Sequence, residues 1–205
     1  HSPPGEHPVV NVSREDAEAF CRWLTERERK QKLIAANHVY RLPTDLEWSR
    51  LAGLRGEEGD WPQQRDGKSD EFPWGRDWPP PPLAGNFADE ASAIGADKKI
   101  LDYQDDFPAI APVGHYLPNV FSLYDMAGNV QEWVSDDYSE VGARAVARAV
   151  ARGGAWNSYA RQHLFISSRT PVRSDQARTD FYGFRVVLAK VDMITEKEPA
   201  PATAP

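Results

Sequence analysis

The feature that most constrains the fold is the segment from about residue 54 to residue 122, which has neither helical nor strand periodicity. It includes four consecutive prolines at 79–82, and proline is excluded from helix interiors and from central strands. So long a stretch without regular structure is uncommon in a compact domain unless something holds it in place. We expect bound cations and aromatic packing to do so, through Trp61, Phe72, Trp74 and Trp78.

Two helices are predicted before this segment. Residues 13–30 repeat apolar side chains at helical spacing, with Ser13 as the N-cap and Asp16 placed to complete a capping box. A shorter helix is predicted to begin after Thr44, with Glu47 in the same role, because the sequence LPTDLEWSRLAG ends in a glycine stop. Both helices are expected to be structural.

Short strands are predicted in the C-terminal half. Residues 129–138 and 181–190 carry β-type runs, and the second is the clearest strand signal in the chain. The duplicated AVAR of residues 145–152 is interpreted as part of a hairpin loop and strand, since a solenoid needs several longer repeats.

The composition suits one globular domain with protein, peptide or small-molecule partners. We expect a linker at residues 1–6, a domain at 7–190 and a disordered tail at 191–205, which is charged and then rich in proline and alanine. A net charge of -7 leaves no basic face for nucleic acid, and no apolar run is long enough to span a membrane. No targeting segment is visible, so localisation stays open, with the cytoplasm favoured.

The cysteine count limits the chemistry. Cys21 is the single cysteine, so the chain can form neither an internal disulfide nor a zinc site of the CxxC type. It falls on the apolar stripe of the first predicted helix, where a free thiol behaves as a small buried hydrophobe.

Several motifs occur in an order that resembles the formylglycine-generating enzyme, or sulfatase-modifying factor, family, from about His7 to Lys190. The most specific are LYDMAGNVQEW, RGGAW and GFRV, supported by HPVV, YRLPTDLEW, FPWG and AGNFAD. The resemblance implies an α+β, loop-rich fold related to the C-type lectin fold. A β-rich segment usually precedes HPVV in the family and is missing here, so we expect other residues to complete the fold, within a larger, bacterial-type polypeptide.

The family commonly holds two calcium ions, and the resemblance carries both ligand sets over. Calcium takes six to eight oxygens from carboxylates, amides, backbone carbonyls and water. The alternative is that these polar side chains only cap turns. The first site would use the side chains of Asn86 and Asp105 with the carbonyls of Phe87 and Phe107; the second would use the side chains of Asp125 and Glu132 with the carbonyls of Gly128 and Val130.

The family's oxidase activity is not expected. Its copper is held by two cysteines five residues apart, and the matching positions here are Ser158 and His163. A hydroxyl and one imidazole are poor substitutes for two thiolates on soft monovalent copper, so copper is not expected to bind. The iron motif of the related sulfoxide synthases is missing as well, because the histidines are scattered.

The remaining expectation is a non-catalytic, calcium-braced domain that binds a protein, peptide or small-molecule ligand. Aromatic, amide and guanidinium groups are typical of binding surfaces. The expected surface comprises Trp156, Asn157, Ser158, Tyr159, His163, Arg169, Arg178 and Tyr182. Two alternatives stay open, namely a divergent metal-dependent oxidoreductase, which would bind copper, and a ligand-binding protein of lectin-like fold diversified by a retroelement, which would vary between RGG and GFR.

Overall fold

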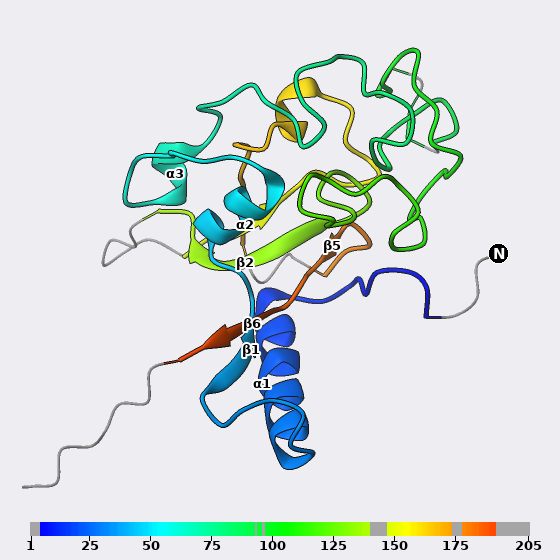
Figure 1. The fold of residues 1–205 in the computed structure, drawn as a ribbon. Coiled ribbons are helices and arrows are strands. Elements are labelled where there is room, and N and C mark those ends of the chain that lie inside the picture. The colour runs from blue at the N-terminus through cyan, green and yellow to red at the C-terminus, as the bar shows by residue number, and fades with distance from the viewer. Residues whose placement is uncertain (1–4, 93, 96, 140–146, 174–177, 192–205) are drawn as a thin grey trace, which may run out of the picture.

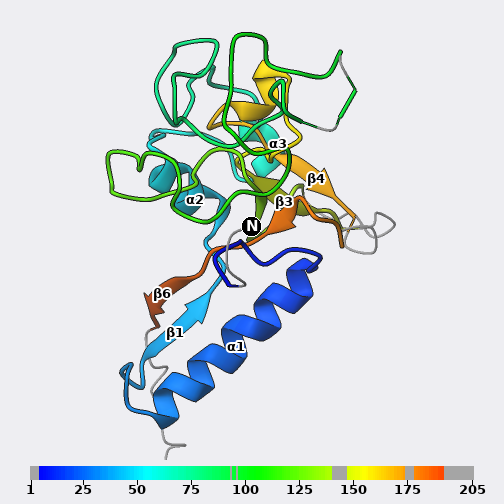
Figure 2. The ribbon, with the colours of Figure 1, turned by 90° about the vertical axis from the view of Figure 1, so that its right-hand side faces the viewer.

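The computed structural model describes residues 5–92, 94, 95, 97–139, 147–173 and 178–191, and the chain has an α+β fold with few regular elements (Figure 1). One part is a loop-rich body around a four-stranded sheet, and the other is an extension in which the first helix lies along a two-stranded ribbon (Figure 2). The elements are α1 (Arg14–Lys30), β1 (His38–Arg41), α2 (Asp45–Ala52), α3 (Pro62–Arg65), β2 (Gln131–Asp137), β3 (Ala149–Arg152), the 3-10 helix η1 (Arg161–Leu164), β4 (Thr170–Val172), β5 (Tyr182–Gly183) and β6 (Val187–Lys190).

Both predicted helices are confirmed, with their caps. At the start of α1 the Ser13 hydroxyl accepts from the Asp16 amide at 3.2 Å, and the Asp16 carboxylate accepts from the Ser13 amide at 2.8 Å. Thr44 and Glu47 form the same reciprocal pair before α2. Gly53 ends α2 in the left-handed conformation, with φ of 111°, which costs glycine little.

The strand order of the main sheet is β4-β3-β2-β5, in which β5 lies parallel to β2 and the other pairs are antiparallel. The strand expected at residues 129–138 is confirmed as β2, and the second AVAR copy forms β3. The single strand expected at 181–190 is wrong. Its start is β5 of the main sheet and its end is β6, which pairs with β1, because the chain leaves the sheet where Arg185 turns to bind Glu132.

The middle segment contains only α3 as a regular element among its described residues. As expected, aromatic side chains pack within it: the Phe72 ring stacks on Trp74 and on Trp78, with centroid distances of 4.6 and 5.6 Å. Trp74 also contacts the buried Phe87 at 5.4 Å, so the proline-rich loop is attached to the rest of the body. Aromatic contact therefore replaces backbone pairing there.

Residues 1–4 of the expected linker and 192–205 of the expected tail lie outside the described residues. Glu6, the last residue of that linker, accepts a backbone hydrogen bond from Val113 at 2.7 Å and so lies against the body. No helix in the described ranges is long and apolar enough to cross a membrane.

Candidate functional site

The RGG loop, residues 152–154, is held by a buried ionic cluster. Arg152 ends β3 and forms hydrogen bonds with the Asp45 carboxylate, the Ser49 hydroxyl and the backbone of two later residues. We call the group the Asp45 cluster; its charged members are Asp45, Glu57, Arg65, Arg152 and Arg169. It connects α2, α3, β3 and the segment before β4, so it fixes where the loop starts.

Charge balance decides the protonation of this cluster. Burial alone would raise the pKa of Asp45, but the surrounding guanidinium groups of Arg152 and Arg169 lower it below the ordinary value. Burial lowers the pKa of Arg152 from its usual value, and the Asp45 charge opposes that shift. Asp45 is therefore ionised at neutral pH and bridges three arginines.

Arg169 is a correction to the expected ligand surface. Its side chain is fully buried, with Nη2 2.9 Å from Asp45 and Nη1 2.6 Å from Glu57. A guanidinium with two carboxylate partners in the interior cannot face a ligand, and the sequence around Arg169 carried no sign of partners so far away in the chain. Its role is to close the Asp45 cluster.

Tyr182 is a second correction, because it belongs to the core. Its ring packs on Trp133 with a centroid distance of 4.8 Å, and burial raises the pKa of its hydroxyl. Arg178 is exposed, but it pairs with Asp16 at the start of α1, at 2.5 Å. It therefore ties this segment to the extension.

Ser158 and His163, which the resemblance matched to copper ligands, both have an atom near Gly154. The Ser158 hydroxyl and the His163 carbonyl lie 3.5 and 3.6 Å from the point where a Cβ on Gly154 would sit. Ser158 is buried, and its hydroxyl accepts from the Ala155 amide at 3.0 Å, so it closes a turn. His163 is exposed on η1.

The single thiol belongs to the hydrophobic core. Cys21 is 2% exposed on α1 and packs in the core cluster with Leu42 and Trp133. Burial raises the pKa of its thiol, which favours the neutral form. The expectation of a buried cysteine is confirmed.

Four residues of the expected surface remain available to a ligand, and we call them the Trp156 surface: Trp156, Asn157, Tyr159 and His163. Tyr159 is 38% exposed and His163 is exposed, while the first two are half-buried. The Trp156 indole donates to the Asp180 carbonyl at 3.3 Å, which brings residues 153–163 beside the start of the GFR segment, as expected.

The first expected calcium site combines one buried oxygen without a partner, on Asn86, with a buried carboxylate, Asp105. The Asn86 side chain is buried; its nitrogen donates to the Ala109 carbonyl at 2.7 Å, but its Oδ1 has no partner. Asp105 is buried too and accepts only backbone amides, from Phe87 at 2.7 Å and Phe107 at 3.0 Å. Burial raises its pKa to about 7, and among the described residues it has no ion pair. These groups fit a hard cation.

The second expected site is partly taken. The Glu132 carboxylate is bound by Arg185 through two contacts, at 2.5 and 2.6 Å, and accepts from the Trp48 indole at 2.8 Å. Asp125 keeps one oxygen without a partner, and burial raises its pKa. Arg185 therefore already supplies a positive charge here. The Gly128 amide donates to the Gly153 carbonyl at 2.8 Å, which joins the loop at residues 127–129 to the RGG loop.

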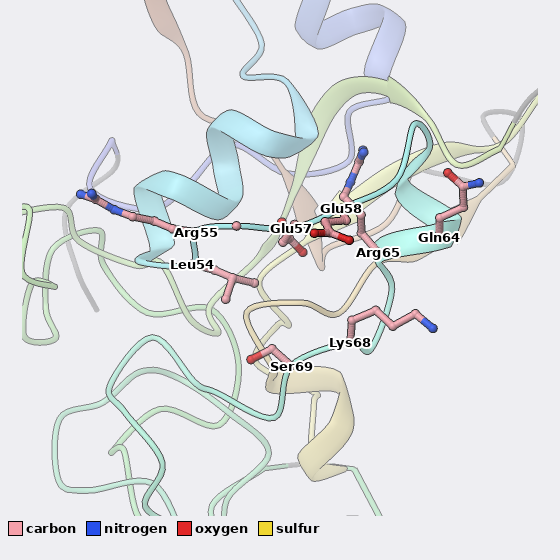
Figure 3. Close-up of a pocket in the computed structure, with 9 residues that line it drawn as sticks. Leu54, Arg55, Glu57, Glu58, Gln64, Arg65, Lys68 and Ser69 are labelled. Carbon is pink, nitrogen blue, oxygen red and sulfur yellow. The ribbon is translucent and has the colours of Figure 1, made fainter.

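The described residues contain no group of three or more acidic, histidine or cysteine side chains arranged as a metal site. They do form pockets, and one of about 430 Å³ lies over the Asp45 cluster, with Glu57 and Arg65 in its wall (Figure 3). Its other charged lining residues, Arg55, Glu58 and Lys68, are exposed.

Comparison with known proteins decides the family. The family model described as the sulfatase-modifying factor enzyme 1-like domain matches residues 2–190. The chain belongs to the sulfatase-modifying factor family. Three of its motifs contact one another in the structure. LYDMAGNVQEW is joined to RGGAW by the Gly128–Gly153 backbone hydrogen bond and to GFRV by the Glu132–Arg185 ion pair.

The chain is similar both to a protein named as inactive and to one named as an enzyme. The chain is 30% identical over 190 residues to inactive C-alpha-formylglycine-generating enzyme 2 of Bos taurus, covering 88% of this chain and 50% of the relative. It is 32% identical over 183 residues to the formylglycine-generating enzyme of Streptomyces coelicolor, covering 80% of this chain and 48% of the relative. The chain thus spans about half the length of these curated relatives.

Solved structures show the same fold. Treponema denticola variable protein 1 superposes with a TM-score of 0.65 at 18% identity, over 93% of this chain and 73% of that one. At that identity the likeness concerns the fold alone, and it agrees with the expected loop-rich α+β architecture.

Sequence reasoning missed the Asp45 cluster. Asp45 follows the N-cap of α2, where an acidic residue is explained by the helix dipole without any tertiary partner. Arg152 of the RGG motif could have indicated a buried ionic cluster, because a charged residue at the end of an apolar strand needs a buried partner.

Proposed function

We propose that this domain is a non-catalytic, ligand-binding member of the sulfatase-modifying factor family. The observation that carries the proposal is the residue types at Ser158 and His163, which the resemblance matches to the copper-binding cysteines of the family's oxidases. The Ser158 hydroxyl and the His163 backbone carbonyl both lie near Gly154. The hydroxyl is buried and hydrogen-bonded in a turn, and Cys21 is in another core. Two curated relatives named as inactive support the same conclusion.

Calcium at the first expected site is part of the proposal. Asn86 Oδ1, the Asp105 carboxylate and the carbonyls of Phe87 and Phe107 would hold the ion, which would supply positive charge to a buried acidic loop. At the second expected site, Asp125 would contribute its free oxygen, while Arg185 already balances Glu132. We therefore expect the first site to bind more tightly than the second.

The ligand-binding face would be the Trp156 surface. The indole of Trp156 is held at one edge by the Asp180 carbonyl, so its ring offers a fixed apolar face. Tyr159 and His163 stand exposed beside it along η1 and the preceding loop. Rigid aromatic groups next to hydrogen-bonding side chains suit a protein, peptide or small polar ligand.

The first experiment tests catalysis. The purified domain is incubated with copper, oxygen, a reductant and a peptide containing the Cys-x-Pro-x-Arg motif, and aldehyde is measured by mass spectrometry. An active formylglycine-generating enzyme serves as the positive control. We expect the peptide to remain unchanged; aldehyde from this domain would favour the divergent oxidoreductase and overturn the proposal.

The second experiment tests the roles proposed for Ser158 and His163. Copper(I) affinity is measured by competition with a chromogenic chelator for the wild type and for the double substitution Ser158→Cys with His163→Cys. We expect copper binding in the double variant and none in the wild type, because two thiolates are suited to monovalent copper. Tight binding by the wild type would contradict the proposed role of these two positions.

A diversified surface is the second candidate, favoured by the fold shared with a protein named as variable. Exposed residues of the Trp156 surface are the positions where changes would cost little stability. The sequences of this segment from sister isolates decide: changes clustered at Asn157, Tyr159 and His163 support diversification, whereas uniformity excludes it.

A further inference from the structure

A second pocket, of about 590 Å³, lies between the C-terminal end of α2 and the loop at residues 119–123. Its volume is that of sites that enclose small organic molecules. None of its residues belongs to the Trp156 surface or to the expected calcium sites. The lining residues are Arg50, Leu51, Arg55, Gly56, Phe121 and Leu123.

The pocket combines an apolar wall with two cations. Phe121 is 44% exposed, although a large aromatic side chain is normally buried, and Leu51 and Leu123 are half-buried beside it. No acidic residue lines this pocket. A ligand with an apolar body and an anionic end would match both features.

The two guanidinium groups are free to bind such an anion. Within the described part of the chain, Arg50 and Arg55 form no ion pair and no side-chain hydrogen bond, unlike Arg41, Arg76 and Arg185, which pair with carboxylates. Figure 3 shows the Arg55 side chain pointing away from Glu57, Glu58 and Lys68 of the first pocket. Guanidinium groups bind carboxylates through paired, charge-assisted hydrogen bonds.

The walls are held in place before any ligand arrives. The Asn119 side chain donates to the Leu51 carbonyl at 2.6 Å, which attaches the loop to α2. Its Oδ1 accepts from the amides of Phe121 and Leu123, at 2.9 and 3.1 Å. A preformed site loses less entropy on binding.

The end of α2 does little to repel an anion. A helix C-terminus carries partial negative charge on its unpaired carbonyls. Here the Ser49 and Arg50 carbonyls accept from the backbone after the helix, and that of Leu51 accepts from Asn119. Two full positive charges therefore outweigh the remaining dipole.

We infer that this pocket binds an organic carboxylate with an aromatic or branched aliphatic body, which places its apolar part against Phe121 and its carboxylate between Arg50 and Arg55. Such a group occurs in a free small acid and at the C-terminus of a polypeptide that ends in an apolar residue. The inference is independent of the proposed function of the Trp156 surface.

The test uses 8-anilinonaphthalene-1-sulfonate, a fluorescent aromatic anion whose emission rises in apolar surroundings. The whole domain is titrated with this probe, and bound probe is displaced by 4-phenylbutyrate. Neutral 4-phenylbutyramide is the matched control, and we expect it to compete at least about tenfold more weakly, because charge-assisted hydrogen bonds are lost.

Two peptides identify the source of the carboxylate. One ends in phenylalanine with a free carboxylate, and the other has the same sequence with an amidated end. Displacement by the free-acid peptide supports a chain terminus, and displacement by phenylbutyrate alone supports a small acid. Failure of every carboxylate to displace the probe, or equal displacement by the amides, overturns the inference.

Variants keep the test specific to this pocket. Arg50→Gln with Arg55→Gln should weaken probe and carboxylate binding at least about tenfold, and Phe121→Ala should weaken both. Arg22→Gln, an exposed arginine on α1, is the control and should change nothing. All the substituted residues are exposed, so unchanged melting curves are expected. Wild-type binding by the folded double variant would refute the assignment.

Discussion

Asp45→Asn should destabilise the protein strongly, because this one carboxylate holds three arginines. Asp45 is fully buried and pairs with Arg65 at 3.0 Å, with Arg169 at 2.9 Å and closely with Arg152. Asparagine keeps the shape and one acceptor but removes the charge. Glu57 would then be the remaining carboxylate of the Asp45 cluster.

The expected magnitude follows from the cost of an unbalanced buried charge. Removing one partner of a buried ion pair costs about 3–5 kcal/mol, and the retained acceptor places this substitution near 3 kcal/mol. For a chain of this length each kcal/mol lowers the melting temperature by about 2–4 °C, so we expect a fall of about 6–12 °C. Because Arg152 begins the RGG loop, probes of the Trp156 surface should also report greater mobility.

Urea denaturation followed by circular dichroism measures the change in the free energy of unfolding. Glu71→Gln is the control: Glu71 pairs with Arg76 at 2.6 Å, but both side chains are well exposed, so the loss should stay below about 1 kcal/mol. A double-mutant cycle with Arg152→Met should show a coupling of about 1 kcal/mol or more between the two sites. The reasoning fails if Asp45→Asn is no more damaging than the control.

Three further perturbations test other parts of the structure. Calcium chelation should lower the melting temperature, since an ion at 100 times its Kd stabilises the native state by about 2.7 kcal/mol, and Asn86→Ala should abolish the response in a calorimetric scan. Gly128→Ala should cost about 3 kcal/mol in urea denaturation, because φ is 73° and the new Cβ would collide with the Asn86 carbonyl; a neutral result would contradict the close approach of these loops. The Arg41 hydrogen bond lowers the pKa of Glu47 to about 2, so the stability it contributes is present above about pH 4.5 and is lost as the pH falls towards 2. Glu47→Gln should therefore cost about 1 kcal/mol at pH 7, after screening at this partly exposed site, and progressively less in acid, where an undiminished cost would refute the assignment.

Local signals in the sequence were reliable where the interaction is itself local. The capping boxes at Ser13 and Thr44 join residues three apart, and the structure contains both. The apolar stripe that placed Cys21 inside is a property of one helix. The same holds for β2, whose β-type run lies within seven residues.

The family motifs carried information of a different kind. They correctly indicated a loop-rich α+β fold. The order of the motifs along the chain identifies the family and with it the fold, which local helix and strand preferences do not. The prediction that Ser158 and His163 replace copper-binding cysteines stays a prediction; in the structure the Ser158 hydroxyl and the His163 backbone carbonyl lie near Gly154.

Burial and partnership across the chain were decided by the tertiary structure. Arginine is usually a surface residue, but Arg169 is buried. Its partner Asp45 lies 124 residues away in the sequence, so only the fold brings the two charges together. Tyr182 starts what looks like one continuous strand, but the chain leaves the main sheet after Gly183 and joins β1 instead. Residue type and periodicity determined the helices and the buried thiol. Pairing energies between distant segments determined which polar side chains remain exposed, because those energies depend on neighbours that a linear pattern does not contain.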